Sequence, residues 1–197
     1  MEQIQDGTGK GNLAKVDNDN RLYTNNVNRE EVELAIYLGN GYNINTGLVD
    51  ITNASTENAI CYIENIGSED IIINEILIIL GASTGGSGDG TLKVYRNPTT
   101  GTIISNAINV ESNVNRNFGS SNLLNVKAYK GATGNTLSGG SVFGSTTRST
   151  ASVIDFTSTP LLLKTGNSIG LTWSAAVGNT SQSVRIATTL FVRTNDI

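Results

Sequence analysis

The chain has 197 residues, a net charge of −4 and no histidine. Its length predicts one domain with a sizeable core. Without histidine, Ser-His-Asp and Cys-His nucleophilic systems are excluded, and so is the commonest ligand of zinc, copper and iron. The 13 Lys and Arg residues are scattered rather than clustered, which argues against nucleic acid as a partner.

Neither a targeting nor a membrane segment is visible. The start of the chain lacks a basic region followed by an apolar one, and no run approaches the ~18 consecutive apolar residues of a membrane span. We therefore expect synthesis in the cytoplasm and no membrane partner. The single cysteine, Cys61, lies inside the apolar run Ile60–Ile63, which predicts a buried structural thiol.

Residues 1–28 are polar, and their few apolar residues follow no period that would create a packing face. Such a segment has little to pack against within its own domain, so it orders on a partner or stays mobile. We predict an extended N-terminal arm over residues 1–28 and a β-sandwich over residues 29–197.

Arg29–Leu38 fits two secondary structures. A capping box formed by Asn28 and Glu31, with Gly39 just after the end, is typical of a helix. The alternation of Val32, Leu34, Ile36 and Leu38 with other residues is typical of a strand, and Asn40-Gly41 then signals a hairpin turn. The alternation favours the strand.

Two apolar runs, Ala59–Ile66 and Ile71–Leu80, flank the polar break Gly67–Asp70. They predict a pair of strands around which the sheet is organised. Every residue from Ile76 to Leu80 is apolar, so this strand needs cover on both faces: a second sheet on one side and something else, such as a neighbouring subunit, on the other.

Further alternating segments follow, separated by Gly- and Asn-rich turns: Leu92–Tyr95, Leu124–Tyr129, Ile169–Trp173 and Val184–Val192. About ten short strands in total predict an all-β fold, best fitted by a jelly-roll β-sandwich. Trp173 shares its face with Ile169 and Leu171, which places it in the core.

The motifs that suggest chemistry are weak. Asp6–Gly11 is similar to a phosphate loop, but Gly11 stands where Ser or Thr is required. Asp17–Asn20 starts like a calcium loop and is then interrupted by Arg21-Leu22. The carboxylates around the central strands are scattered: Glu64, Glu69, Asp70 and Glu75. We expect no catalytic residue, no cofactor and no metal site, and hence a protein that is not an enzyme.

A sugar platform is the alternative binding function. Aromatic faces stack on pyranose rings, and amides bond to hydroxyl groups. Tyr95 and Tyr129 are the candidate glycan contacts of a carbohydrate-binding or host-receptor-binding module.

Loose, turn-like motifs rich in Gly, Asn and Tyr occur along nearly the whole chain: Asp6–Gly9, Ala14–Asp17, Arg21-Leu22, Gly39–Gly47, Tyr62–Asn65, Tyr95–Thr99, Asn117–Ser121, Tyr129–Gly131 and Gly166–Gly170. In this order, the motifs resemble those of the small virion proteins of tailed bacteriophages.

The resemblance implies a jelly-roll protein on the capsid surface of the virion, as a decoration (cement) or head-fibre component. Such proteins are often trimeric, so the expected partners are copies of the same chain and the major capsid protein. Attachment is expected through the N-terminal arm, with these contact residues: Asp6, Lys10, Leu13, Lys15, Val16, Arg21 and Leu22. No catalytic residues come with this resemblance.

Overall fold

The structure is a computed structural model. It describes residues 31–52, 56–85, 89–149, 152–156, 160–176, 178 and 180–193. The arm predicted over residues 1–28 lies outside the described residues.

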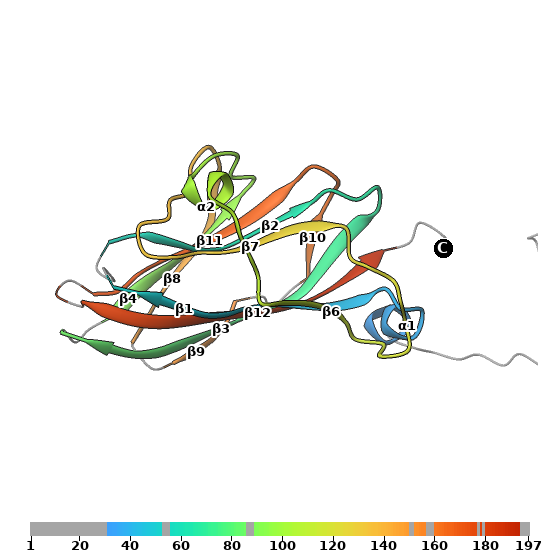
Figure 1. Cartoon of the computed structure of the whole chain (residues 1–197), viewed down its shortest axis with the longest axis horizontal. Helices are drawn as coiled ribbons and strands as arrows, with labels where there is room; N and C mark the ends of the chain where they lie inside the picture. Colours follow the sequence, from blue (N-terminus) through green and yellow to red (C-terminus); the bar gives the residue numbers. More distant parts are fainter. Residues whose placement is uncertain are drawn as a thin grey trace, which may run out of the picture. The chain divides into compact units, whose positions relative to one another are not determined.

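Two antiparallel six-stranded sheets form the described fold. In the first sheet the order is β10 (Leu161–Leu163), β3 (Asp70–Thr84), β12 (Ser181–Arg193), β1 (Gly41–Ile51) and β6 (Ser112–Asn115), and β9 (Val153–Asp155) also pairs with β3. In the second sheet the order is β5 (Ile108–Asn109), β7 (Val126–Lys130), β2 (Asn58–Asn65), β11 (Ser168–Ser174), β4 (Asp89–Arg96) and β8 (Ser141–Ser149). Figure 1 shows the sheets as two layers.

The strand pairs are nested, as in a long hairpin that has been rolled up. β1 pairs with β12, β2 with β11, β3 with β9 and β10, and β4 with β8. The pair β1–β12 lies in the first sheet, β2–β11 in the second, β3 with β9 and β10 in the first, and β4–β8 in the second. Within each sheet the neighbouring pairs are joined by further pairing, β3 with β12 and β4 with β11. This is a jelly roll, so the predicted fold class is confirmed.

The core lies between the inner faces of the two sheets. Its largest fully buried side chains are aliphatic, apart from Trp173. Ile169, Leu171 and Trp173 all belong to it, as their alternation predicts, and Cys61 is fully buried as well.

One buried hydrogen-bonded chain connects the two layers. Trp173 Nε1 on β11 donates to Gln182 Oε1 on β12 at 2.8 Å, and Gln182 Nε2 donates to the Gly81 carbonyl on β3 at 3.0 Å. Both side chains are buried, so neither can exchange its partner for water without opening the sandwich.

The strand predicted for Arg29–Leu38 is wrong, because helix α1 (Glu31–Tyr37) occupies this segment. Val32 and Ala35, three residues apart, pack on Ile72 of β3. That contact uses helical spacing, whereas a strand would have sent the two side chains to opposite faces. Tertiary packing thus decides between two local patterns of similar strength.

Gly39 ends α1 with a backbone φ of 75°. Its N–H donates to the Ile36 carbonyl at 3.0 Å, and the Asn40 N–H donates to the Ala35 carbonyl at 2.7 Å. This is the Schellman pattern, in which glycine takes the left-handed position. Asn40-Gly41 therefore links α1 to β1 and does not form the predicted hairpin turn.

The two central apolar runs are strands, but they do not pair with each other as predicted. β2 belongs to the second sheet and β3 to the first, so Gly67–Asp70 carries the chain from one layer to the other. Asn65 fixes this crossing: its Nδ2 donates to the carbonyls of Glu69 and Leu163, and its Oδ1 accepts from Gly67 N.

Short helix α2 (Thr102–Ser105) covers the outer face of the second sheet, where Figure 1 shows it outside that layer. Ile103 forms a separate apolar cluster there with Ala59 and Tyr62 of β2, against which Leu137 packs. Ala59 and Tyr62 on the outer face of β2 are thereby removed from water.

We predict that Gln182→Met destabilises the protein. Methionine keeps the volume of the side chain but leaves Trp173 Nε1–H and the Gly81 carbonyl without their buried partner, at a cost of about 1–3 kcal/mol. Denaturant unfolding measures the change. Asn113→Ala, at an exposed amide on β6, is the control and is expected to stay within about 0.5 kcal/mol of the wild type. An equally stable Gln182→Met would show that the link between the layers contributes nothing.

Candidate functional site

Three exposed aliphatic residues lie in one cross-strand row on the outer face of the first sheet, in which Arg185 takes the position on β12. In the backbone register, Leu48 of β1 lies opposite Arg185 of β12, Arg185 opposite Ile79 of β3, and Ile79 opposite Val153 of β9. Residues directly opposite one another share a face. Leu48 is 53% exposed, Ile79 37% and Val153 61%. We call Leu48, Ile79 and Val153 the outer apolar row.

Helix α1 covers another part of the same face. Ile72, which lies under Ala35, is 8% exposed, whereas Leu162 of β10, directly opposite Ile72, is 49% exposed. The first sheet is therefore shielded at Ile72 and open at the outer apolar row.

A loop beside α1 also presents apolar side chains. Phe118 is 99% exposed and Leu123 is 90% exposed. Asparagine side chains tie this loop to the end of the helix: Asn117 Nδ2 donates to the Tyr37 carbonyl at 3.0 Å and Asn115 Nδ2 to the Gly39 carbonyl at 2.7 Å. The loop is thus held in place while its two large apolar residues face solvent.

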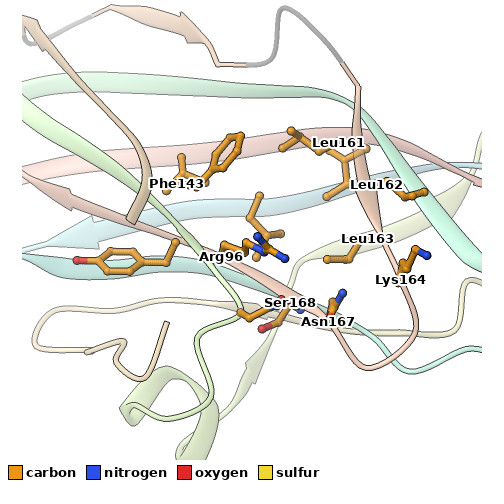
Figure 2. A pocket seen from close by; sticks show the side chains of 13 residues that line it. Arg96, Phe143, Leu161, Leu162, Leu163, Lys164, Asn167 and Ser168 are labelled. Carbon is orange, nitrogen blue, oxygen red and sulfur yellow. Dashed lines mark hydrogen bonds between the residues drawn. The ribbon is translucent and has the colours of Figure 1, made fainter. Parts of the chain in front are cut away.

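A cavity of about 320 Å³ opens at the side of the sandwich where β10 of the first sheet approaches β4, β8 and β11 of the second. Its inner wall is aliphatic and comes from both sheets: Ile73, Val94, Leu161, Leu163 and Ile169. Figure 2 shows the leucines of β10 on one side of the lining and Phe143 of β8 on the other. Phe143 meets Phe156 edge to face, with ring centroids 6.5 Å apart.

The polar part of the lining includes two cations, Arg96 at the end of β4 and Lys164 just after β10. Arg96 follows buried Val94 by two residues and lies opposite buried Ile169, so it is on the core-facing side of β4. Neither cation forms an ion pair within the described part of the chain. None of the described residues that line the cavity is acidic.

Glu57, just before β2, accepts hydrogen bonds from three side chains on the outer face of the second sheet. Its Oε1 accepts hydrogen bonds from Tyr95 Oη at 2.7 Å and from Thr172 Oγ1 at 2.8 Å, and its Oε2 pairs with Lys93 Nζ. Burial alone raises the pKa of the Glu57 carboxyl, but the donated hydrogen bonds outweigh burial and hold this pKa below its ordinary value of 4.5.

The two tyrosines predicted to contact a glycan lie on the outer face of the second sheet, in one cross-strand row. Tyr129 lies opposite Tyr62, Tyr62 opposite Gly170, and Gly170 opposite Tyr95. Leu137 and Pro98 pack over Gly170 and separate Tyr95 from the other two rings. Tyr129 stacks on Tyr62, with centroids 5.9 Å apart. The structure thus does not bring Tyr95 and Tyr129 together as one platform.

The other residues singled out from the sequence are dispersed. The expected capsid contacts lie outside the described residues: Asp6, Lys10, Leu13, Lys15, Val16, Arg21 and Leu22. Glu64 pairs with Lys127 on the second sheet, whereas Glu75 is on β3 of the first. Burial raises the pKa of the Cys61 thiol to about 12, which makes it a poor nucleophile at neutral pH.

Within the described residues, no group of three or more Asp, Glu, Cys or His side chains is arranged to hold a metal ion. None of the helices in that part of the chain has the length and apolar character needed to cross a membrane.

The sequence pattern did not single out the cavity. Arg96 and Lys164 are separated by many residues and are brought together only by the pairing of β4 with β11 and the crossing from β10 to β11. One local signal was present: Arg96 continues the alternation of Leu92 and Val94, at a position where an apolar residue is expected.

No protein-family model matches the chain, and no curated protein matches its sequence. The two-sheet antiparallel sandwich is therefore assigned from the structure itself.

We predict that Glu57→Gln makes stability less dependent on pH in acid. Because the pKa of Glu57 is lowered in the folded state, its carboxylate contributes its full stabilisation above pH 4.5, and the contribution is lost as the pH falls through the lowered pKa. The wild type should exceed Glu57→Gln in stability at pH 7, and the difference should shrink toward pH 3.

Denaturant titrations at a series of pH values measure this difference. Glu33→Gln, at an exposed position on α1, is the control and should follow the wild type throughout. A difference between the wild type and Glu57→Gln that stays constant from pH 7 to pH 3 would contradict the role given to the carboxylate.

Proposed function

We propose that this protein is a non-enzymatic structural component of a tailed-bacteriophage virion, a capsid decoration (cement) or head-fibre protein. In this proposal it assembles as a homo-oligomer, a trimer by resemblance, through the outer face of its first sheet. It attaches to the major capsid protein through residues 1–28. The observation that carries the proposal is the outer apolar row beside a jelly-roll core.

The energetics support an interface centred on this row. Covering a half-exposed aliphatic side chain contributes on the order of 1 kcal/mol. The outer apolar row by itself is therefore too small for a stable assembly, because specific interfaces bury about 1,200–2,000 Å² in total. Further apolar surface comes from Leu162 on the same face and from Phe118 and Leu123 in the loop beside α1.

Multivalent attachment is the mechanism. An arm of this length forms a modest number of contacts, but several arms on one oligomer raise the effective local concentration after the first arm has bound. The avidity of the oligomer for the capsid therefore exceeds the affinity of a single arm by about 10²–10⁴-fold. An oligomer thus gives stable decoration of a capsid from individually weak contacts.

A carbohydrate-binding or host-receptor-binding module is the second candidate. Tyr95 favours it, because its half-buried ring lies beside the Glu57–Lys93 pair on an open sheet face. A glycan array of the purified protein tests it: saturable binding that is lost in Tyr95→Ala or Tyr129→Ala would support this function over the structural one.

We predict that Val153→Lys dissociates the oligomer. A lysine placed in an apolar interface between copies is buried without a partner, whereas in a monomer it would remain solvated. Val142→Lys is the matched control, since Val142 is 54% exposed and lies on β8 of the second sheet. Native mass measurement should give about three chain masses for the wild type and Val142→Lys, and one for Val153→Lys. A wild type that is monomeric at micromolar concentration would contradict the proposal.

We also predict that deletion of residues 1–28 separates assembly from attachment. The shortened protein should keep the oligomer mass and the unfolding midpoint of the full chain, but it should no longer co-sediment with phage heads assembled from the partner capsid protein. Retained co-sedimentation would show that the arm is not the attachment element.

A further inference from the structure

The cavity between β10 and β4 has the size and lining of a site for a small amphipathic molecule. Its volume of about 320 Å³ is at the lower end of the range of about 300–1,000 Å³ for small-molecule sites. Its inner wall includes Ile73, Val94 and Ile169, which belong to the main core. A bound aliphatic group would therefore contact the core itself.

The charge at this site is of one sign. Arg96 occupies a core-facing position on β4, and Figure 2 shows its side chain among the residues that line the cavity. An arginine at the rim of a sandwich is ordinarily explained by its aliphatic stem lying on apolar surface with the head in water. Here a second cation, Lys164, also lines the cavity, and none of the described lining residues is acidic.

Two other polar side chains of the lining, Asn97 and Ser168, are engaged in hydrogen bonds within the protein. Ser168 Oγ donates to the Pro98 carbonyl at 2.9 Å, and Asn97 Oδ1 accepts from Ser168 N at 3.0 Å. The guanidinium of Arg96 and the ammonium of Lys164 have no hydrogen-bonded partner among the described residues. Both are therefore available to donate charge-assisted hydrogen bonds to an anion in the cavity.

We propose that this cavity binds an aliphatic monocarboxylate of medium chain length. The alkyl chain lies against Val94, Leu163 and Ile169. The carboxylate accepts charge-assisted hydrogen bonds from Arg96, whose planar fork matches a carboxylate, while Lys164 adds favourable charge. This inference does not depend on the proposed virion function, because the cavity lies within a single chain.

Isothermal titration with sodium octanoate, below its micelle concentration and using the full chain, tests the inference. Acetate retains the charge but lacks the alkyl body, and octylammonium retains the body but reverses the charge. We expect saturable binding of octanoate at one site per chain and no saturable binding of either control ligand.

Arg96→Gln is the diagnostic variant and Arg116→Gln the matched control, because Arg116 is an exposed arginine that does not line the cavity. Loss of a charge-assisted contact should weaken octanoate binding about tenfold or more in Arg96→Gln and leave Arg116→Gln unchanged. Arg96 is exposed, so both variants are expected to fold, which circular dichroism verifies.

Methyl NMR spectra recorded with octanoate locate the ligand independently of affinity. Shifts at the methyl groups of Val94, Leu163 and Ile169 are expected. The inference is overturned if octanoate gives no saturable heat, if Arg96→Gln binds it as tightly as the wild type, or if these methyl groups do not shift.

Discussion

The two faces of β3 meet different surroundings, and much of the molecule follows from this constraint. Its inner residues, among them Ile71, Ile73 and Ile78, face the second sheet and form the core. Its outer face is covered in one part and exposed in another: Ile72 is covered by α1, whereas Ile79 is in contact with solvent. Covering the second apolar face of such a strand is favourable in water, so the uncovered part of β3 supports the proposed interface between copies of the chain.

In the second sheet, part of the outer face is covered by other segments of the same chain. Helix α2 and Leu137 cover its outer face at Ala59 and Tyr62. The segment responsible is inserted between β4 and β8, the innermost pair of the nested series, so the insertion leaves the outer pairs intact. In the first sheet, by contrast, α1 shields Ile72 and leaves Leu48, Ile79 and Val153 exposed. The two sheets therefore differ in where their outer faces are covered: the second at Ala59 and Tyr62 of β2, the first at Ile72 of β3.

Most of the fold could be predicted from the sequence because period-2 alternation is a strong local signal. The strands around Ile71 and Ile169, the buried Trp173 and the buried Cys61 all follow from it. The pairing of strands could not be predicted in the same way. Gly67–Asp70 is similar to a hairpin turn, but Asn65 and its contacts send the chain to the other layer. That outcome depends on Leu163, which is distant in sequence.

The helix was the less favoured of the two alternatives for Arg29–Leu38, and the cavity was missed, for related reasons. Val32, Leu34 and Ile36 fit a strand, whereas the Gly39 cap and the packing of Val32 and Ala35 on Ile72 select the helix. The cavity depends on where β4, β8, β10 and β11 come together, which no local pattern contains. Tyr95 and Tyr129 were correctly placed on strands, but Leu137 lies between them because of a loop whose path the sequence pattern did not reveal.

The central claim is that the outer face of the first sheet is covered by another copy of the chain. Hydroxyl-radical footprinting read by mass spectrometry tests it without any substitution, because it reports the solvent exposure of individual side chains. The account predicts that Leu48, Ile79 and Val153 are protected in concentrated protein and become reactive on dilution below the dissociation constant. Equal oxidation of these residues at both concentrations would contradict it.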